Sequence, residues 1–302
     1  MVEAAARDAP TPPLARLRLR LRGAVQGVGF RPFAHQIARR HRLSGFVRND
    51  ADGVLVEIEG FQCAAFLDAL RDEKPPLATI DSIEIERIDP RGEHGFSIVD
   101  SAGGRTRTRI VADATTCDAC LDELFEPASR FHLYPFVTCT HCGPRFTIAS
   151  SLPYDRSQTS MAKFAMCDDC AADYRDPGSR RFHAETIACP TCGPQLDHDS
   201  ATIVATLRAG KIVAVKGIGG YHLICDAHNE QAVAELRRRK GRDAKPFAVM
   251  AANVASIGLF ADATEAEIAL VSHRARPIVV MKSKGLLAPS IAPHLDRIGL
   301  ML

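Results

Sequence analysis

The loop Gly23-Ala24-Val25-Gln26-Gly27-Val28-Gly29-Phe30-Arg31 joins two segments of different periodicity. Before it, residues 16–22 alternate between arginine and leucine, the two-residue period of a strand with one buried and one basic face. After it, Pro32 to Leu43 has the pattern of a helix, and Pro32 is tolerated in its first turn. Such a loop can direct consecutive backbone N–H groups at an anion, although a tight turn without a ligand is the alternative interpretation.

The segments after this helix complete one domain. Strands are expected at 46–49 and 54–59, joined by a turn at 49–53 whose residues accept positive φ. A second helix at 63–71 and strands at 80–88 and 95–99 follow. The order β-α-β-β-α-β predicts a ferredoxin-like sandwich of the α+β class.

The glycine loop and Asn49 carry a family resemblance. Gly-x-Val-Gln-Gly-Val-Gly-Phe-Arg, followed by Asn49 in Val-Arg-Asn-x-x-Asp-Gly, resembles the acylphosphatase family over residues 14–100. The resemblance implies that Arg31 and the loop amides hold a phosphate and that Asn49 orients the attacking water. It implies a hydrolysis without a metal or a covalent intermediate, with a transition state stabilised by the loop. The expected catalytic residues are Arg31 and Asn49, and the expected phosphate-binding residues are Gln26, Gly27, Val28, Gly29 and Phe30.

Eight of the ten cysteines form a tandem repeat with a period of fifty residues. The ligand set Cys117, Cys120, Cys139 and Cys142 recurs as Cys167, Cys170, Cys189 and Cys192. Two Cys-x-x-Cys turns complete a closed tetrahedral shell, which predicts two structural zinc ions. Gly143 and Gly193 follow the second turn of each repeat, where a bare backbone is expected to bring amide N–H groups to the sulfurs.

Other interpretations of these cysteines remain open. They could be redox-active dithiols or buried thiols without metal, and the turns could pair across the repeats instead of within them. His132, His141 and His183 lie close by and could replace a sulfur, although ordinary polar or core histidines are the simpler interpretation. Without a secretory signal, paired cysteines indicate a reducing cytoplasm and metal binding before disulfides.

The pattern changes to α/β after residue 198. Helices are expected at 202–209 and 231–240, a buried strand at 211–216, and further strands at 247–250 and 277–281. The stretches 221–227 and 236–249 resemble the first part of a YrdC-like domain, the fold of threonylcarbamoyl-adenylate synthases. Residues 216–220 read Lys-Gly-Ile-Gly-Gly where those synthases have Pro-Thr-Glu or Pro-Thr-Asp, so threonine recognition is not expected. The resemblance implies ATP contacts from Lys216, Tyr221, Lys240, Arg242 and Lys245, against the simpler interpretation of a solvated basic helix end.

The order of these parts resembles the HypF family of carbamoyltransferases, which mature [NiFe]-hydrogenases. The resemblance implies hydrolysis of carbamoyl phosphate, adenylation of the carbamate by ATP, and transfer to a cysteine of a HypE-type acceptor protein. A segment for the last step is not present and the YrdC-like part is short, so a fragment is expected. The expected division is a disordered tail at 1–13, an acylphosphatase-like domain at 14–100, a tandem zinc-finger region at 101–198 and a partial YrdC-like domain at 199–302.

Two other functions fit the same sequence. One is a general acylphosphatase with structural zinc modules, and the other is a zinc-ribbon module that binds RNA or protein through the basic strand and residues 237–242. The net charge of +2 and the four tyrosines without any tryptophan count against nucleic-acid binding. No apolar run is long enough for a membrane span.

Overall fold

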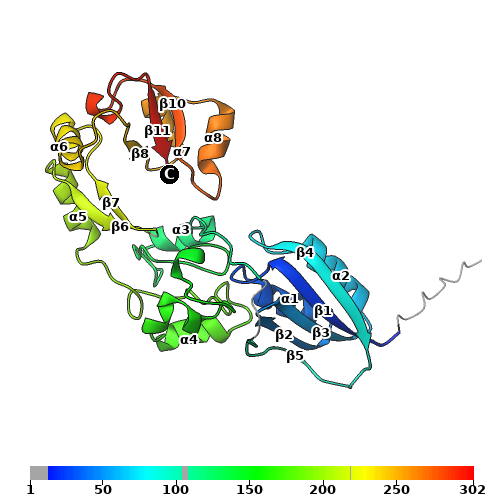
Figure 1. Ribbon diagram of the computed structural model, residues 1–302. Helices are drawn as coiled ribbons and strands as arrows, with labels where there is room; N and C mark the ends of the chain where they lie inside the picture. Colours follow the sequence, from blue (N-terminus) through cyan, green and yellow to red (C-terminus); the bar gives the residue numbers. More distant parts are fainter. Residues whose placement is uncertain (1–12, 104–107, 218) are drawn as a thin grey trace, which may run out of the picture. The chain divides into compact units, whose positions relative to one another are not determined.

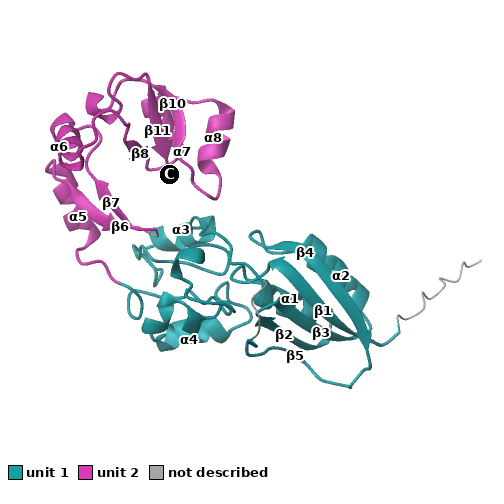
Figure 2. Cartoon of the chain, viewed as in Figure 1, with its two compact units in different colours: residues 1–194 teal, residues 195–302 magenta. Residues whose placement is uncertain are grey.

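The structure of the chain is a computed structural model that describes residues 13–103, 108–217 and 219–302. The predicted tail, apart from Pro13, and Ile218 of the glycine string therefore lie outside the described residues. The chain divides into two compact units, residues 1–194 and residues 195–302 (Figure 2). Each unit is described by itself.

The first unit begins with a five-stranded sheet in the order β4-β1-β3-β2-β5. Its helices α1 and α2 pack on one face of the sheet (Figure 1). β5 pairs parallel with β2, and the other neighbours are antiparallel. The elements are β1 (Ala15–Ala24), α1 (Phe30–Arg40), β2 (Ser44–Asp50), β3 (Gly53–Gly60), α2 (Cys63–Asp72), β4 (Thr79–Ile88) and β5 (Phe96–Ile98). The predicted ferredoxin-like sandwich is confirmed.

The predicted boundaries of the first helix and of the hairpin turn in this domain are wrong. The first helix begins at Phe30 rather than Pro32, because Gly29 adopts the left-handed φ of 76° and caps it. It ends at Arg40, and Leu43 instead joins the core. The hairpin turn is shorter than predicted, since β2 runs to Asp50 and β3 begins at Gly53. Gly53 is required by packing as well as by its φ of 137°, because a Cβ would lie 2.1 Å from the Leu21 carbonyl oxygen.

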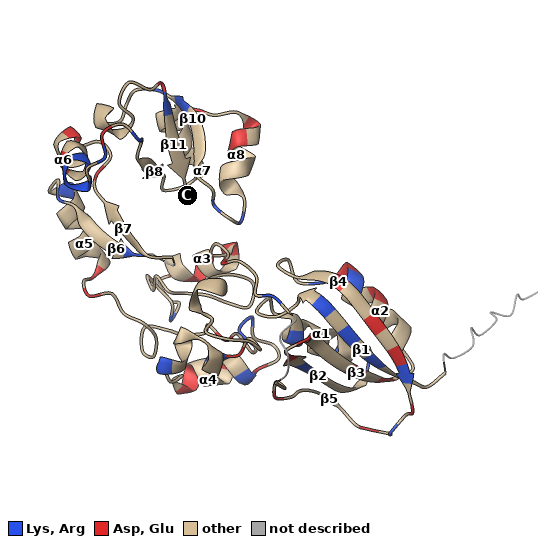
Figure 3. Cartoon of the chain, in the orientation of Figure 1, with Lys and Arg blue, Asp and Glu red and all other residues tan. Residues whose placement is uncertain are grey.

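The arginine face of β1 is neutralised by carboxylates of β3, β4, the end of β2 and the turn that follows β2 (Figure 3). Arg16 is 1% exposed and pairs with Glu57 and Glu59 at 2.7 and 3.0 Å. The other partners along the strand are Glu57 and Glu86 for Arg18, Asp50 for Arg20, and Asp52 and Glu84 for Arg22. The predicted basic face is therefore a ladder of ion pairs, and the nucleic-acid interpretation loses one of its two surfaces.

The rest of the first unit consists of two similar metal-ligand repeats. Each contains an eight-residue helix that begins directly after the first cysteine, α3 (Asp118–Phe125) and α4 (Asp168–Arg175). Short 3-10 helices η1 (Phe146–Ile148), η2 (Arg156–Gln158) and η3 (Ser160–Lys163) lie between the repeats. The core of this region is small and consists largely of the cysteines with aromatic and aliphatic side chains. A small core of this kind needs metal or a neighbour for stability.

The second unit has a hairpin of β6 with β7 and a four-stranded sheet in the order β8-β11-β10-β9. The predicted strand at 211–216 is shorter and is not buried, since β6 forms a hairpin with alternating half-buried and exposed residues. The predicted helices at 202–209 and 231–240 are present as α5 and α6 within two residues. The elements are α5 (Ser200–Arg208), β6 (Val213–Lys216), β7 (Tyr221–Ile224), α6 (Glu230–Lys240), β8 (Ala248–Met250), α7 (Val254–Phe260), β9 (Ala261–Asp262), α8 (Glu265–Ser272), β10 (Val279–Ser283), η4 (Pro289–Ile291) and β11 (Arg297–Met301). Among the described residues, no helix has the length and apolar character of a membrane span.

Candidate functional site

Five of the seven residues expected to act on a phosphate line one pocket in the first unit, and Gln26 and Val28 are not among its lining residues. Gly27, Gly29 and Arg31 come from the loop and the start of α1, and Asn49 comes from the end of β2. The part of the first unit that follows β5, here called the metal-ligand region, supplies further lining residues, which are Thr140, Arg145, Tyr154, His183 and Glu185. The site is therefore built by two regions of the first unit that are far apart in sequence.

Arg31 is held by two carboxylates from the metal-ligand region. Its guanidinium pairs through Nη2 with Glu185 at 2.6 Å and through Nη1 with Asp155 at 2.8 Å. Arg31 is 8% exposed, while the side chains of Glu185 and Asp155 are 4% and 25% exposed. Burial raises the pKa of Glu185, and the Arg31 guanidinium opposes that shift. A buried charge needs such partners, so the pair fixes Arg31 at the pocket.

Asn49 is fixed at one end of its amide and free at the other. Its Nδ2 donates to the carbonyl oxygen of Tyr154 at 3.4 Å, and Arg31 Nη2 donates to the same carbonyl at 3.4 Å. The Asn49 side chain is 2% exposed, yet its Oδ1 has no hydrogen-bond partner among the described residues. A buried acceptor without a partner is rare and is suited to a bound water or ligand.

Two glycines of the loop adopt the left-handed backbone conformation that occurs in anion-binding nests. Gly27 and Gly29 adopt left-handed φ values of 71° and 76°. The side chains of Val28 and Phe30 are in the hydrophobic core, so only their backbones are available to a ligand. The side chain of Gln26 does not point at a ligand either. It bonds the backbone of Asp50, Gly53 and Tyr154 and so connects the loop to its neighbours.

The sequence interpretation missed the residues from the metal-ligand region. Arg145 donates to the carbonyl oxygen of Gly27 and to those of Cys139 and Thr140, which links the glycine loop to the first repeat. A signal for Glu185 exists in the repeat itself. The residue of the first repeat that corresponds to Glu185 is Pro135. Tyr174, whose hydroxyl bonds Glu185 at 3.1 Å, corresponds to Leu124. Polar residues appear where the second copy departs from the first.

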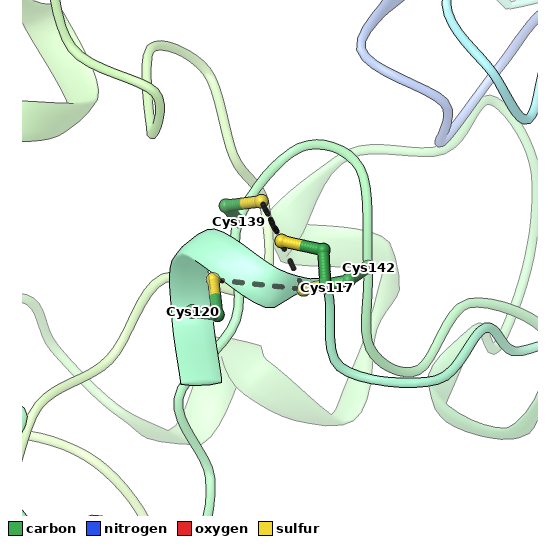
Figure 4. A group of neighbouring side chains, drawn as sticks. All are labelled: Cys117, Cys120, Cys139 and Cys142. Atoms are coloured by element: carbon green, nitrogen blue, oxygen red, sulfur yellow. Dashed lines mark hydrogen bonds between the residues drawn. The ribbon is translucent and has the colours of Figure 1, made fainter. Parts of the chain in front are cut away.

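The eight cysteines form two groups that each could hold a metal ion, and each group lies within one repeat as the sequential pairing predicted. Figure 4 shows the first group, Cys117, Cys120, Cys139 and Cys142. Three Sγ–Sγ separations in the first group are 3.7 to 3.8 Å and three in the second are 3.6 to 3.8 Å, and all four sulfurs of each group lie within 4.8 Å of one another. Tetrahedral Zn–S bonds of about 2.3 Å place sulfurs about 3.8 Å apart, whereas a disulfide needs about 2.05 Å. The cysteine geometry fits a four-sulfur metal site and excludes disulfides within either group.

The nearby histidines and glycines have roles other than those considered from the sequence. His132, His141 and His183 belong to neither cysteine group among the described residues. The amides of Gly143 and Gly193 donate to the carbonyl oxygens of Ala114 and Cys189 rather than to a sulfur. The predicted approach of an amide N–H group to a sulfur is present at His141, whose amide donates to Cys139 Sγ at 3.4 Å, while the two glycine amides bond carbonyl oxygens.

The glycines are required for space. A Cβ on Gly143 would lie 2.4 Å from Thr138 Oγ1, and one on Gly193 would lie 2.1 Å from the Tyr134 hydroxyl. Both positions therefore pack too tightly against a neighbouring side chain for any larger residue. The backbone conformation adds a second restriction at Gly143, whose φ is 86°.

The residues expected to contact a nucleotide lie in the second unit in two places. Lys216 and Tyr221 face each other across the β6–β7 hairpin, with Lys216 Nζ 5.9 Å from the centre of the tyrosine ring. Lys240 and Lys245 are exposed near the end of α6, and the Arg242 guanidinium lies 5.2 Å from the centre of the Phe247 ring. A cationic side chain beside an aromatic ring, as at Lys216 and Arg242, has the chemistry to meet a phosphate and a base.

Family models match four segments of the chain. Residues 17–98 match the acylphosphatase model, and residues 116–149 and 166–197 match the model described as the HypF finger. Residues 205–302 match a YrdC-type model described as telomere recombination. The carbamoyltransferase HypF of Rhizobium leguminosarum bv. viciae is 60% identical over 291 residues, which cover 96% of this chain and 38% of that protein. The chain belongs to the HypF family. The comparison confirms the family predicted from the sequence.

Further relatives agree with the HypF assignment. A full-length HypF solved in a phosphate- and nucleotide-bound form matches the structure with a TM-score of 0.92 and 41% identity, covering 98% of this chain and 41% of that one. The acylphosphatase of Thermotoga maritima is 36% identical over 85 residues, which are 93% of that protein and 27% of this chain. The chain thus contains an acylphosphatase-family region and spans about two-fifths of the length of the curated HypF relatives it matches.

Proposed function

We propose that this chain carries the first reactions of a hydrogenase-maturing carbamoyltransferase. At the Arg31 pocket, carbamoyl phosphate and water give carbamate and inorganic phosphate. The observation that carries this proposal is the meeting of Arg31, the left-handed glycines and the unpartnered Oδ1 of Asn49 around one pocket. Its support includes the acylphosphatase-family match of residues 17–98.

The proposed mechanism uses hydrogen bonds and charge alone. Arg31 and the backbone amides around Gly27 and Gly29 hold the phosphoryl oxygens, so negative charge developing in the transition state meets fixed donors. Asn49 Oδ1 accepts a hydrogen bond from the attacking water and aims its oxygen at phosphorus. The P–O bond to the acyl group then breaks, and its electron pair leaves with the carbamate.

The second unit is proposed to use that carbamate. ATP is the proposed co-substrate, and Lys216, Tyr221, Lys240, Arg242 and Lys245 are its proposed contacts. Adenylation would give carbamoyl adenylate and pyrophosphate, and a HypE-type protein is the proposed final acceptor. Carbamate decomposes in water, which is a physical reason to place both reactions in one polypeptide.

The metal in the two cysteine groups is proposed to be zinc, with a structural role. Four thiolates leave no open coordination position, which excludes direct activation of water at either ion. Metal-bound thiolates need a reducing compartment, so the cytoplasm is the proposed location. The proposed division of the chain remains a tail at 1–13, an acylphosphatase-like domain at 14–100, the metal-ligand region at 101–198 and the YrdC-like part at 199–302.

Phosphate release from carbamoyl phosphate tests the proposed hydrolysis. Arg31→Ala and Asn49→Ala are each expected to lower kcat/KM by at least about 100-fold, since each removes a group that acts in the transition state. Arg40→Ala is the matched control, because Arg40 lies at the other end of α1 and pairs with exposed Glu73. Full activity in the Arg31 and Asn49 variants would remove the basis of the proposal.

A further inference from the structure

The phosphate-binding arginine of the first unit is connected to the second cysteine group through one carboxylate. Glu185 lies four residues before Cys189, and its Oε1 is 2.6 Å from Arg31 Nη2. Arg31 and Glu185 are 154 residues apart in sequence, and neither is exposed enough to exchange its partner for water. The contact is therefore part of the folded arrangement of the unit and not a chance surface pair.

Glu185 is itself immobilised on both of its oxygens. The Tyr174 hydroxyl lies 3.2 Å from Oε1 and 3.1 Å from Oε2, and the backbone N–H of Arg156 donates to Oε2 at 3.0 Å. Arg156 also donates from its side chain to the carbonyl oxygens of Glu185 and Ile187, both at 2.8 Å. A carboxylate held at this many points cannot follow a moving guanidinium, so it sets the guanidinium's orientation.

The elements that hold Glu185 are those that the second metal ion would order. Tyr174 is on α4, four residues after Cys170, and Glu185 precedes Cys189 by the same number. The first repeat has Leu124 and Pro135 at the matching positions, which can neither hold nor supply a carboxylate. The two copies therefore have metal ligands at equivalent positions, but they differ in the residues that reach the pocket.

We infer that Glu185 is the positioning residue of Arg31: the second metal-ligand repeat supplies a fixed carboxylate that orients the guanidinium for the phosphoryl group. The inference rests on the proposed hydrolysis for its catalytic consequence. A guanidinium has five N–H donors, and Nη1 and Nη2 each make one short contact with a carboxylate. Their other contacts, to Ser101 Oγ and the Tyr154 carbonyl oxygen, are long at 3.4 Å and are the ones that phosphoryl oxygens would replace. Without Glu185, Arg31 would keep its charge and its contact with the partly exposed Asp155, but its Nη2 group would lose the buried carboxylate that fixes its direction. A misdirected donor lowers kcat more than it raises KM.

The kinetic test combines Glu185→Gln with Arg31→Lys in a double-mutant cycle on carbamoyl phosphate hydrolysis. Glu185→Gln is expected to lower kcat at least about tenfold and to change KM less than about threefold. In the Arg31→Lys background, Glu185→Gln is expected to lower kcat less than about threefold, because an ammonium group has no planar array of donors to orient. Glu126→Gln, an exposed glutamate of the first repeat, is the control. Equal losses in both backgrounds, or none, would overturn the inference.

A second readout does not depend on turnover. NMR of protein with ¹⁵N-labelled arginine reports the rotation of the Arg31 Nη groups, whose signals are assigned by their loss in Arg31→Lys. The Nη2 group, which contacts Glu185, is expected to rotate slowly in the wild type and freely in Glu185→Gln. Slow rotation in both proteins would contradict the positioning role. Slow rotation in the wild type, free rotation in the variant and no hydrolysis in either would instead refute the proposed function alone. If Glu185→Gln fails to keep both metal ions, Tyr174→Phe carries the same test with a smaller expected change.

Discussion

Arg130 of the first repeat donates from Nη1 to Sγ of Cys170 in the second, 3.1 Å away. The relationship is reciprocal, since Arg180, fifty residues later, donates to Sγ of Cys120 at 3.7 Å. Each arginine also pairs with an acidic residue of the opposite repeat, Asp173 for Arg130 and Glu123 for Arg180. The two copies therefore contact each other as the halves of a two-fold arrangement do, and each stabilises thiolate charge in the other.

Arg130→Ala is accordingly expected to weaken the second metal site rather than the first. Loss of a donor to a ligating sulfur lowers metal affinity by about 10- to 100-fold. Cadmium-113 NMR of the substituted protein, with one four-sulfur signal per site, would measure this, and the signal of the second group should be lost first on chelator titration. Arg180→Ala should give the opposite order, and a uniform weakening of both sites would contradict the reciprocal contact.

The unfolding free energy lost when an arginine is removed from the ion-pair ladder on β1 should depend on how deeply that arginine is buried. Arg16→Ala leaves Glu57 and Glu59 buried beside each other and is expected to cost about 3–5 kcal/mol of unfolding free energy. Arg18→Ala removes the pairs with Glu57 and Glu86, but the arginine side chain is 39% exposed and Glu57 keeps Arg16, so the loss should be about 1 kcal/mol or less. Urea unfolding of both variants provides the measurement, and equal losses would show that burial does not decide these energies.

His183 should make the stability of the first unit depend on pH. Burial lowers its pKa from 6.5 to about 4, with Arg31 and His35 acting in the same direction and Asp155 against it. The unfolded chain therefore binds a proton between these values that the folded chain does not. The resulting stability is present above pH 6.5 and is lost as pH falls to 4, by at most about 3 kcal/mol.

The matched variant for this prediction is His183→Leu. The first repeat has Leu133 at the same position, and both residues have a left-handed φ, 52° for Leu133 and 50° for His183. The unfolding free energy of the wild type, measured relative to that of the variant, should decrease as pH falls from 6.5 to 4. Cysteine protonation affects both proteins alike. A difference that stays constant with pH would disprove the assignment.

Gly143→Ala should destabilise the first metal-ligand repeat. Its φ of 86° is left-handed, and a Cβ would lie 2.4 Å from Thr138 Oγ1, which donates to the Cys142 carbonyl oxygen. Gly92→Ala is the control, since its φ of 68° carries the same backbone cost of about 1 kcal/mol with no atom within 4 Å. Thermal unfolding and metal content should separate the two, with a larger loss for Gly143→Ala.

The features that could be predicted from the sequence are those determined by residues a few positions apart in the chain. Alternation along β1 and the glycine loop identify a strand and the start of a helix, because side-chain direction repeats every two residues in a strand. Cys-x-x-Cys turns bring two sulfurs together within four residues, and the period of fifty predicts which turns share an ion. Helix and hairpin boundaries moved by a few residues where glycine conformation or packing determined them, as at Gly29 and Gly53.

Tertiary contacts decided the rest. The alternating arginines indicated a basic face, but their charge is cancelled by carboxylates that only strand pairing brings opposite them, such as Glu57 beside Arg16. Arg31 was identified from its loop, whereas Glu185 became part of its site only because the second repeat folds against the sheet domain. Local geometry places a residue's own backbone and near neighbours. The partner of a buried charge is set by packing across the whole unit, which no short pattern records.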